Sequence, residues 1–529
     1  MTTETQPASG SSRAGGSQAL DKQVFVIAGV VILGAIMSIL DITVVSVALR
    51  TFQDIFGATT AQVAWTMTGY TLALAFVIPL TGWAADRFGT KRLYILALIL
   101  FTAGSALCST AGSLEVLVLF RIIQGLGGGM LMPLGMTIMT RAAGPERIGR
   151  VMAFLGVPML LGPIFGPILG GWLIDIASWH WIFLINVPIG VIAVIYALRA
   201  LPKDHVEPTE TFDWLGMLLL SPGLASFLFA VSSIPGAKEA HGTMWTGRVI
   251  GFGVLGIVLI AAFIPWALNR RNIHPLVELR LFADRKLTAA VIAMALFAMA
   301  FFGASLLFAL YFQQVRGESP LSSGWLIAPQ GFGAMLTMPI AGALADRIGP
   351  GKVVMTGLVL DTVGLGMLGF IDDQTSYAYL ISAFVVMGLG MGSTMMPMFS
   401  AAMSSLSDHN IARGSTLLNI TQQVAASCGT ALFSVLLTNA FNSSDSIGPA
   451  IAIRSAGNDQ GAVQAILQKL GIAQDQVPAL VAKALNDMGH AYADVFVVAT
   501  ILVGCCLIPA FFLPRKPADH PVDPAAMMH

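Results

Sequence analysis

The chain has 529 residues, of which 56% are hydrophobic and only 11% are charged, whereas soluble proteins carry about 25% charged residues. A soluble core cannot bury this much apolar surface, so the composition excludes an ordinary soluble enzyme or binding domain. Lysine plus arginine equal aspartate plus glutamate at 28 each, so no net positive charge suggests a nucleic-acid partner. The four cysteines lack the spacing of a metal site.

The elements, in chain order, are a polar tail and fourteen apolar runs. Residues 1–22 are rich in Ser, Gly and Thr and predict a disordered cytoplasmic tail. Each apolar run is near the length of about 20 residues that a helix needs to cross a bilayer. The runs predict an all-α membrane protein with transmembrane helices near residues 24–48, 62–82, 93–112, 114–140, 151–174, 179–201, 214–234, 248–268, 288–312, 323–345, 353–371, 378–403, 414–439 and 492–513.

Lysine and arginine predict the orientation, because cytoplasmic loops carry an excess of these residues. With the N-terminus inside, the inner segments hold 20 of them and the outer segments hold seven, so both termini are expected in the cytoplasm. The one long outer segment, 440–491, contains AVQAILQKL and VPALVAKALNDM, whose periodicity predicts short amphipathic helices. We interpret this segment either as a surface cap or as a device that handles long lipid tails.

Two inner loops repeat each other. GWAADRFGTK runs from Gly82 to Lys91, and GALADRIGPGK begins at Gly342, 260 residues later. GLGGGMLMP and GLGMGSTMMP repeat at an offset of 263 residues. Two matches at nearly one offset predict two six-helix halves with two helices inserted between them, which is a transporter architecture. The expected parts are a tail, a first bundle, an insertion with its linker, a second bundle and a final tail, at residues 1–22, 23–202, 203–286, 287–513 and 514–529.

A carboxylate, Asp41, interrupts the apolar run of the first span. It lies eight residues before the outer end of that span, and Arg121 lies eight residues into the fourth span. Both are therefore expected at a depth of about 12 Å. An isolated acid inside the membrane costs roughly 2.5–3.5 kcal/mol, so it must be protonated or paired. Alternation between these two states is what a proton-coupled cycle requires, and a static salt bridge is the structural alternative.

A second intramembrane acid, Asp361, lies about eight residues into the eleventh span, at a depth of roughly 12 Å. It predicts a site that recognises the charge of cationic substrates, or else a neutral carboxyl that is hydrogen-bonded to a neighbour. Aromatic, amide and methionine side chains are candidates for a substrate cavity, because flexible apolar groups suit varied ligands. These candidates are Trp65, Tyr70, Gln124, Met132 and Met395.

The repeated loops are expected to act as a conformational latch. Gly82 permits close helix contact, and the carboxylate of Asp86 can bind the N-terminus of a neighbouring helix, which would close the inner side. The structural alternative is a loop whose basic residues only set the topology. The latch residues are Gly82, Asp86, Arg87, Gly89, Lys91, Gly342, Asp346 and Arg347. The fifth span holds five glycines and three prolines between Gly156 and Gly171, which predicts a bent and closely packed helix.

The expected energy source is an ion gradient, with no cofactor. The sequence lacks the phosphate-binding pattern GxxxxGKS/T of ATP-driven pumps. One charge moved across about 100 mV carries about 2.3 kcal/mol, which sustains a roughly 50-fold concentration ratio. A membrane enzyme would need a catalytic pattern such as HExxH or GxSxG within the spans, and a sensor would need a signalling domain; the sequence shows neither.

Several of these stretches resemble signatures of the major facilitator superfamily. Gly82 to Lys91 resembles its cytoplasmic loop signature, and RIIQG from Arg121 resembles its helix-4 signature. LDITVVSVAL from Leu40 is similar to the helix-1 signature of the fourteen-helix drug:proton antiporters of EmrB/QacA type, and FDWLG and WIFLINVPIG fit that branch. GPIFGPILGG resembles the helix-5 signature typical of antiporters, at Gly162, Gly166, Pro167, Gly170 and Gly171.

The resemblance implies a proton-coupled multidrug efflux transporter of the major facilitator fold. It would export amphipathic, cationic small molecules across the bacterial inner (plasma) membrane, with Asp41 as its proton carrier and Arg121 as the regulator. The implied partners are these substrates and the lipid bilayer. A lipid or glycolipid exporter on the same scaffold is the alternative.

Overall fold

The computed structural model is helical over the residues that it describes. Those residues are 22–143, 147–148, 151, 156, 162, 165–166, 168–174, 176–203, 211–404, 406–407, 410–455, 460–470 and 472–515. No β-strand occurs within these ranges, which confirms the prediction of an all-α protein.

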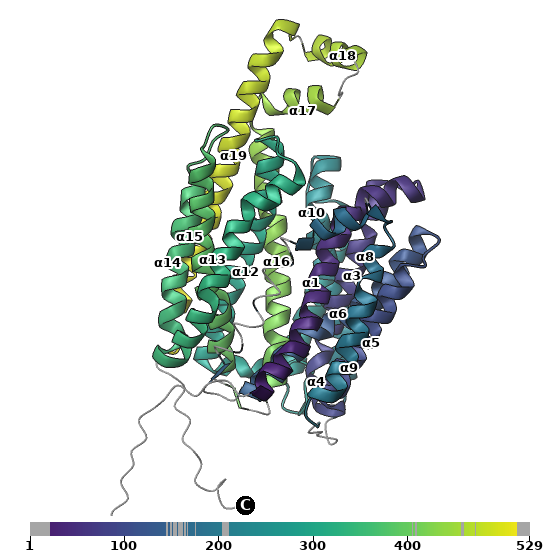
Figure 1. Ribbon diagram of the computed structural model, residues 1–529, viewed down its shortest axis with the longest axis vertical. Coiled ribbons are helices and arrows are strands. Elements are labelled where there is room, and N and C mark those ends of the chain that lie inside the picture. The colour runs from purple at the N-terminus through teal and green to yellow at the C-terminus, as the bar shows by residue number, and fades with distance from the viewer. Residues whose placement is uncertain are drawn as a thin grey trace, which may run out of the picture.

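Two helical bundles stand side by side, the first purple to blue and the second green to yellow in Figure 1. The first contains α1 (Lys22–Phe56), α2 (Thr60–Val63), α3 (Trp65–Val77), α4 (Leu80–Phe88), α5 (Thr90–Cys108), α6 (Leu114–Ala143), α8 (Trp181–Leu184) and α9 (Asn186–Ala200). The insertion contains α10 (Trp214–His241), α11 (Gly247–Leu268) and η2 (Leu279–Ala283). The second bundle contains α12 (Arg285–Gln314), α13 (Pro320–Ile348), α14 (Pro350–Leu368), α15 (Tyr377–Met403), α16 (Ile411–Asn442), α17 (Ile447–Ser455), α18 (Gln460–Leu470), η4 (Gln474–Gln476), α19 (Val477–Cys505) and α20 (Leu507–Ala510).

Thirteen of the fourteen predicted spans have a counterpart among the described helices. Twelve helices are long and apolar enough to cross a membrane, and α3 with α4 forms one further span that is bent by 55°. The bend falls at Pro79, which has no backbone N–H to donate and therefore interrupts the helix. Half of the fifth predicted span, 151–174, falls outside the described residues.

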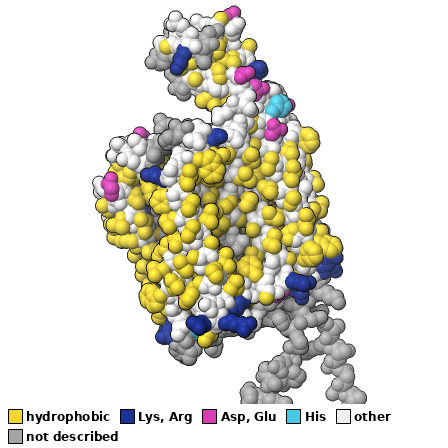
Figure 2. Space-filling view, turned by 180° about the vertical axis from the view of Figure 1, so that it is seen from behind, with side chains coloured by type: hydrophobic (Ala, Val, Ile, Leu, Met, Phe, Trp, Pro, Cys, Tyr) yellow, Lys and Arg dark blue, Asp and Glu magenta, His cyan; other side chains and the backbone are white. Residues whose placement is uncertain are grey.

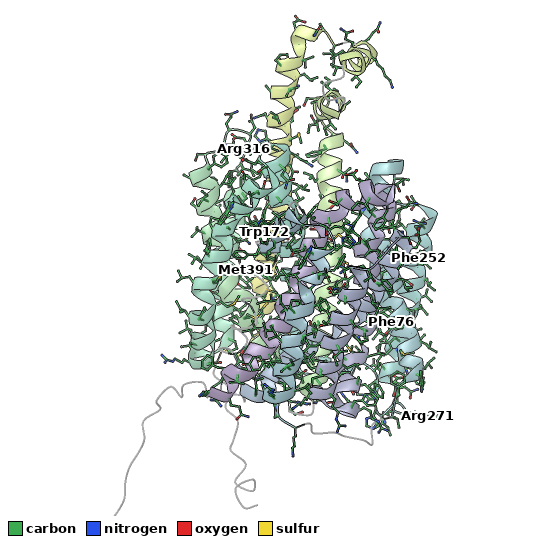
Figure 3. The ribbon with its side chains drawn as sticks, turned by 45° about the vertical axis from the view of Figure 1, so that its right-hand side comes forward. Phe76, Trp172, Phe252, Arg271, Arg316 and Met391 are labelled. Atoms are coloured by element: carbon green, nitrogen blue, oxygen red, sulfur yellow. The ribbon has the colours of Figure 1, made fainter. Side chains whose placement is uncertain are left out.

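The lateral surface of the two bundles is apolar, as a membrane protein requires. Figure 2 shows hydrophobic side chains over the side of the molecule and Lys and Arg side chains gathered toward its lower end. Phe76 and Phe252 are 36% and 42% exposed on this surface, and Arg271 lies at the lower end in Figure 3. The apolar band between polar ends matches the hydrocarbon layer of a bilayer.

The first inserted helix, α10, packs against both bundles and against α11. The ring of Trp65 on α3 stacks on Phe229 of α10 with centroids 5.5 Å apart, and Leu220 of α10 belongs to the same buried cluster as Leu417 of α16. The carboxylate of Asp213 holds the insertion together, because it accepts hydrogen bonds from the Gly216 N–H and the Leu276 N–H, at 2.8 and 3.0 Å. The indole of Trp266 and the amide of Asn272 also donate to this carboxylate, at 2.8 and 3.1 Å. The insertion is therefore a fixed part of the fold.

The long outer segment forms helices that project beyond the bundles (Figure 1). AVQAILQKL lies in α18, as its periodicity indicates. VPALVAKALNDM differs from the expectation of a separate short helix: it is the start of the 29-residue α19, which continues into the last span. No proline separates VPALVAKALNDM from the last predicted span, so one helix runs through both.

Candidate functional site

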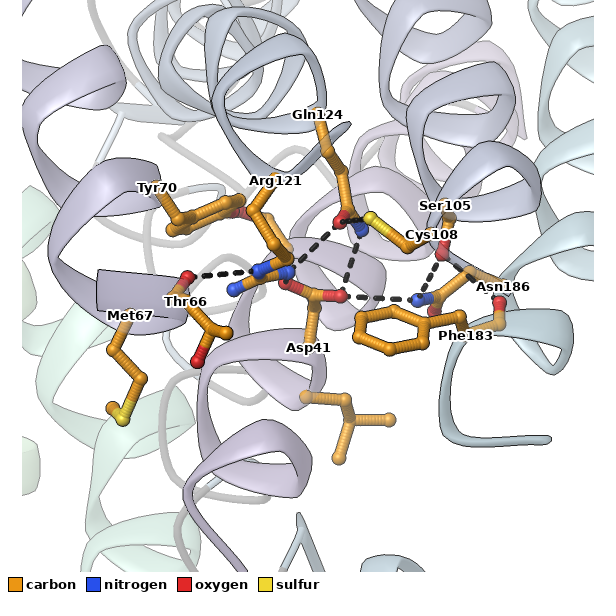
Figure 4. A network of polar contacts seen from close by, with 12 residues as sticks. Asp41, Thr66, Met67, Tyr70, Ser105, Cys108, Arg121, Gln124, Phe183 and Asn186 are labelled. Carbon is orange, nitrogen blue, oxygen red and sulfur yellow. Dashed lines mark hydrogen bonds and ion pairs between the residues drawn. The ribbon is translucent and has the colours of Figure 1, made fainter. Parts of the chain in front are cut away.

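The centre of the candidate site is an ion pair between α1 and α6, drawn in Figure 4. Arg121 Nη1 donates to Asp41 Oδ2 at 2.5 Å, and each residue is only 1% exposed. Charges this deeply buried cost free energy unless their remaining polar atoms are also satisfied. The surrounding side chains supply those partners.

Gln124, one turn along α6 from Arg121, joins both members of the pair. Its Nε2 donates to Asp41 Oδ1 at 2.7 Å, and its Oε1 accepts from Arg121 Nη1 at 2.8 Å. Arg121 Nε donates to the carbonyl oxygen of Thr66 on α3 at 3.2 Å. The thiol of Cys108 lies 3.6 Å from Gln124 Oε1. The acid and the guanidinium are thus held by three helices of the first bundle.

Asn186 closes the other side of the carboxylate. Its Nδ2 lies 3.4 Å from Asp41 Oδ1 and donates to Ser105 Oγ at 3.1 Å, and Ser105 donates in turn to the Phe183 carbonyl at 2.9 Å. Asn186 and Ser105 were not among the residues predicted from the sequence. The signal for Asn186 was its amide within the apolar stretch WIFLINVPIG, which sequence reasoning used only for family resemblance.

Aromatic rings cover the guanidinium. The Arg121 Cζ lies 4.2 Å from the ring centroid of Tyr70 and 5.8 Å from that of Phe183, within the range of cation–π attraction. The Tyr70 hydroxyl lies 3.4 Å from Ser38 Oγ on α1. Tyr70 and Gln124, which we predicted for the substrate cavity, therefore belong to the charged cluster in this structure (Figure 4).

Small residues bring the helices of this cluster together. A Cβ on Gly104 of α5 would lie 2.6 Å from the Gln124 Cα, and one on Gly125 of α6 would lie 2.7 Å from the Tyr70 carbonyl oxygen. Helices can approach this closely only where no side chain intervenes. The glycines therefore position the polar groups around Asp41.

The glycines of the helix-5 signature pack against α1 on both sides of Asp41. A Cβ on Gly162 would meet Ile39, and one on Gly166 would meet Thr43, whose hydroxyl donates to the Gly162 carbonyl at 3.2 Å. A Cβ on Gly170 would lie 3.1 Å from Val44. Gly171 has no atom within 4 Å of a built Cβ, and Pro167 lies outside the described residues.

The repeated loop after α4 joins the two bundles at one end of the molecule. Asp86, 5% exposed, has its Oδ1 3.5 Å from Arg141 Nη2 of α6 and its Oδ2 3.7 Å from Arg413 Nε of α16. A Cβ on Gly82 would lie 3.5 Å from the Arg413 Cα, and the Thr81 and Thr416 hydroxyls are 3.0 Å apart. The acid thus lies beside the first turn of α16, where the helix dipole favours negative charge.

The linker after α11 reaches the same cluster. Arg413 Nη1 lies 3.4 Å from Glu278 Oε2, so one buried arginine faces an acid from the first bundle and an acid from the linker. Glu278, 9% exposed, was missed from the sequence because it lies in a polar loop segment without a motif. In the same region Lys91 Nζ donates to the carbonyl oxygens of Leu198 and Leu201, at 2.9 and 2.7 Å, and so caps the end of α9.

The remaining predicted residues are distributed over both bundles. Gly342 and Met395 are buried, Arg87, Asp346 and Met132 are half-buried, Arg347 is exposed, and Trp65 is 40% exposed beside α10. Asp361 is 2% exposed inside the second bundle, with Thr394 Oγ1 3.1 Å from its Oδ2. The structure therefore brings Asp41, Arg121, Tyr70 and Gln124 together and leaves Asp361 apart from them.

Comparison with known proteins identifies the family. The sequence model of the Major Facilitator Superfamily matches residues 31–430. The multidrug resistance protein B homolog of Mycobacterium tuberculosis is 49% identical over 503 residues, covering 95% of this chain and 92% of that protein. The multidrug export protein EmrB of Escherichia coli is 30% identical over 465 residues, covering 86% and 88%.

Two solved structures share the fold. The human organic anion transporter MFSD10 has a TM-score of 0.57 at 16% identity, covering 91% of this chain and 100% of that chain. The proton:xylose symporter XylE has a TM-score of 0.54 at 16% identity, covering 94% and 98%. Together with the duplicated bundles and the loop between α4 and α5, these matches show that the chain is a multi-pass membrane protein of the major facilitator superfamily, of EmrB type.

Proposed function

We propose that this protein is a proton-coupled multidrug exporter of amphipathic, cationic small molecules. It would work in the bacterial inner membrane with both termini in the cytoplasm. The observation that carries the proposal is the buried pair of Asp41 and Arg121, joined at 2.5 Å within a bundle of a transporter fold. The names of the relatives in M. tuberculosis and E. coli support multidrug export, and the excess of inner lysine and arginine supports the orientation.

The pair offers two protonation states: its net charge is zero when Asp41 is ionised and +1 when Asp41 is protonated. When Asp41 is ionised, Arg121 neutralises it and both side chains stay buried. When Asp41 binds a proton, it no longer attracts the guanidinium, and the Gln124 Oε1 and the Thr66 carbonyl oxygen remain as acceptors for Arg121. Such an alternation lets a proton exchange for a cation in successive halves of a cycle.

The latch supports movement of one bundle against the other. The Asp86–Arg413 pair, the Thr81–Thr416 hydroxyl contact and the Asn419–Met136 contact all join the two bundles at the end where the repeated loops lie. We take this end as the cytoplasmic one, so the structure corresponds to a state that is closed to the cytoplasm. Met132 and Met395 stay proposed contacts for apolar parts of the substrate.

Transport by purified protein in liposomes tests the proposal. An imposed pH gradient should drive uphill accumulation of ethidium in the wild type. Asp41→Asn should abolish this accumulation and retain downhill exchange, because the amide still accepts a hydrogen bond from Arg121 but cannot bind and release a proton. Asp54→Asn is the matched control, since Asp54 is an exposed acid on the same helix.

Normal gradient-driven accumulation by Asp41→Asn, at equal protein content, would contradict proton coupling at this residue. Movement of a fluorescent phospholipid in place of ethidium would select the lipid exporter instead. With one proton exchanged for one ethidium cation, each unit of the imposed pH gradient supports a roughly tenfold ethidium ratio, because about 1.4 kcal/mol is a factor of ten.

A further inference from the structure

The second bundle contains a buried acid that the proposed cycle does not use. Asp361 of α14 is 2% exposed and borders a small apolar pocket that has no room for a water molecule. Seven apolar side chains from α12, α14, α15 and α19 line this pocket: Phe297, Phe301, Ala304, Phe308, Leu365, Met387 and Val503. A drug-sized cation does not fit there in this conformation, whereas a proton does.

Thr394 offers a hydrogen-bond partner to the protonated form of the acid. The Thr394 Oγ1 lies 2.9 Å from the Gly390 carbonyl oxygen and 3.1 Å from Asp361 Oδ2. A hydroxyl has one hydrogen to donate and two lone pairs that accept. The carbonyl can only accept, so the Thr394 hydroxyl either shares its one hydrogen between the two oxygens or, when Asp361 carries a proton, donates to the carbonyl and accepts from the acid.

The charges around Asp361 agree with a protonated acid. On α12 and α19 it faces phenylalanine and valine, and on α15 it faces Thr394 and Met387. α13 packs on α14 through Ala341 and Ala345, and the nearby titratable group between α19 and α20 is the thiol of Cys506. Among the described residues no lysine, arginine or histidine forms an ion pair with Asp361, and an acid without a cation in an apolar interior is stable only in its neutral form.

The repeat relates this pocket to the Asp41 cluster. Shifted by the offsets of 260 and 263 residues, Asp41 corresponds to the segment 301–304, and Gln124 corresponds to Met387. Phe301, Ala304 and Met387 all line the pocket of Asp361. The acids of the two halves therefore lie at corresponding places in their bundles but are carried on different helices.

We propose that Asp361 is a second proton-binding site, and that it holds its proton in the conformation seen here. Proton binding stands on the geometry alone, and only its use in coupling rests on the proposed transport function. In another conformation the acid would release the proton to water and become a carboxylate.

The contacts of α15 give a route to that release. Gly390 allows α15 to lie against the acid, since a Cβ there would be 2.8 Å from the Asp361 Cγ. Two residues beyond Thr394, Met396 meets the first bundle, where a Cβ on Gly156 would lie 3.0 Å from its Cγ. Movement of the first bundle would therefore shift α15 against α14 and open Asp361 to water.

Infrared spectroscopy of the purified protein in H₂O and D₂O tests for the proton directly. A protonated carboxyl gives a carbonyl band that shifts on deuteration. We expect Asp361→Asn to remove one such band and Asp41→Asn to leave that band in place. Thr394→Val should move the band to higher frequency, because the acid loses its hydrogen-bond partner, and this variant keeps the test valid if Asp361→Asn does not fold. Identical carbonyl bands in the wild type, Asp361→Asn and Thr394→Val would overturn the proposal.

Counting protons in liposomes tests the use of the site. The pH gradient that just balances a fixed ethidium gradient gives the number of protons exchanged per ethidium. Asp361→Asn should lower this number by about one for ethidium and for a dication alike. An unchanged number together with a selective loss of dication export would overturn the proposal and assign the residue to substrate charge. If no transport is observed at all, the infrared result still decides on proton binding, so the two failures are distinguishable.

Discussion

Gly89 and Gly349 lie 260 residues apart and adopt the same backbone conformation, with φ 93° and ψ 141° at the first and φ 94° and ψ 138° at the second. Each glycine ends one helix and begins the next, between α4 and α5 in the first bundle and between α13 and α14 in the second. The repeated sequence motif therefore encodes the same sharp turn in each half. In the first bundle the acid of the helix before this turn, Asp86, lies at the interface with α16.

Gly89→Ala should destabilise this turn. A residue with a Cβ pays about 1–3 kcal/mol at this combination of positive φ and extended ψ, which essentially only glycine adopts. We expect a lower thermal unfolding temperature and slower substrate exchange, since the strain displaces Asp86 from Arg413. Gly112→Ala is the control, because Gly112 has negative φ and no atom within 4 Å of a built Cβ. Equal unfolding temperatures for the two variants would show that the turn tolerates a side chain.

Asp86→Asn should slow turnover and leave substrate affinity within a few-fold. The acid lies at the end of the bundle, 3.7 Å from Arg413 of α16, and does not belong to the cluster of polar residues around Asp41. Combined with Arg413→Gln in a double-mutant cycle, we expect a coupling free energy of about 1 kcal/mol for the closed state. Loss of ethidium binding with a normal exchange rate would show that Asp86 belongs to the substrate site instead.

Glu278→Gln tests whether the linker takes part in the latch. Arg413 is shared, with Glu278 Oε2 at 3.4 Å from Nη1 and Asp86 Oδ2 at 3.7 Å from Nε. Removing one acid leaves the other to neutralise the arginine, so Glu278→Gln and Asp86→Asn should each slow exchange less than removal of both acids does. The double variant should be slower than the sum of the two free-energy changes predicts. Strict additivity would indicate that the linker acts independently of the latch.

The sequence predicted that Asp41 and Arg121 lie at the same depth in the membrane, but it did not predict all the residues around them. Asp41 and Arg121 were each placed eight residues from a span end, and the structure has them in contact at 2.5 Å. Rise per residue fixes depth, but the rotation of a helix about its axis depends on packing. For this reason Asn186 was not foreseen, although it faces the same carboxylate.

The helical fold was predictable because apolar length and the repeated loop are both visible in the sequence. The continuation of VPALVAKALNDM into α19 was not, because an amphipathic stretch and an apolar span carry different periodicities and only the absence of a break joins them. Glu278 was not foreseen because the partner of a loop residue is decided by tertiary contact. Arg413, expected only as one inner positive charge, acquires a specific role through that contact.

Asn186→Leu should weaken gradient-driven export. The amide donates toward Asp41 Oδ1 at 3.4 Å and to Ser105 Oγ at 3.1 Å, so it holds the carboxylate in place beside Arg121. Its removal should lower uphill ethidium accumulation about fivefold, which corresponds to a hydrogen bond of about 1 kcal/mol. Ser105→Ala, which keeps the amide, should lower accumulation less. Wild-type accumulation by Asn186→Leu would assign the residue to packing alone.

Gly166→Ala and Gly171→Ala separate two glycines that the sequence motif treats alike. A methyl group on Gly166 would collide with Thr43, two residues from Asp41, whereas one on Gly171 would meet no atom within 4 Å. Overpacking at such a contact typically costs about 1–3 kcal/mol and would push α1 away from the guanidinium of Arg121. We therefore expect Gly166→Ala to impair gradient-driven ethidium export by tenfold or more, on the order of 1.4 kcal/mol, and Gly171→Ala to transport normally. Equal impairment by both would mean that the motif acts through backbone flexibility rather than through close packing on α1.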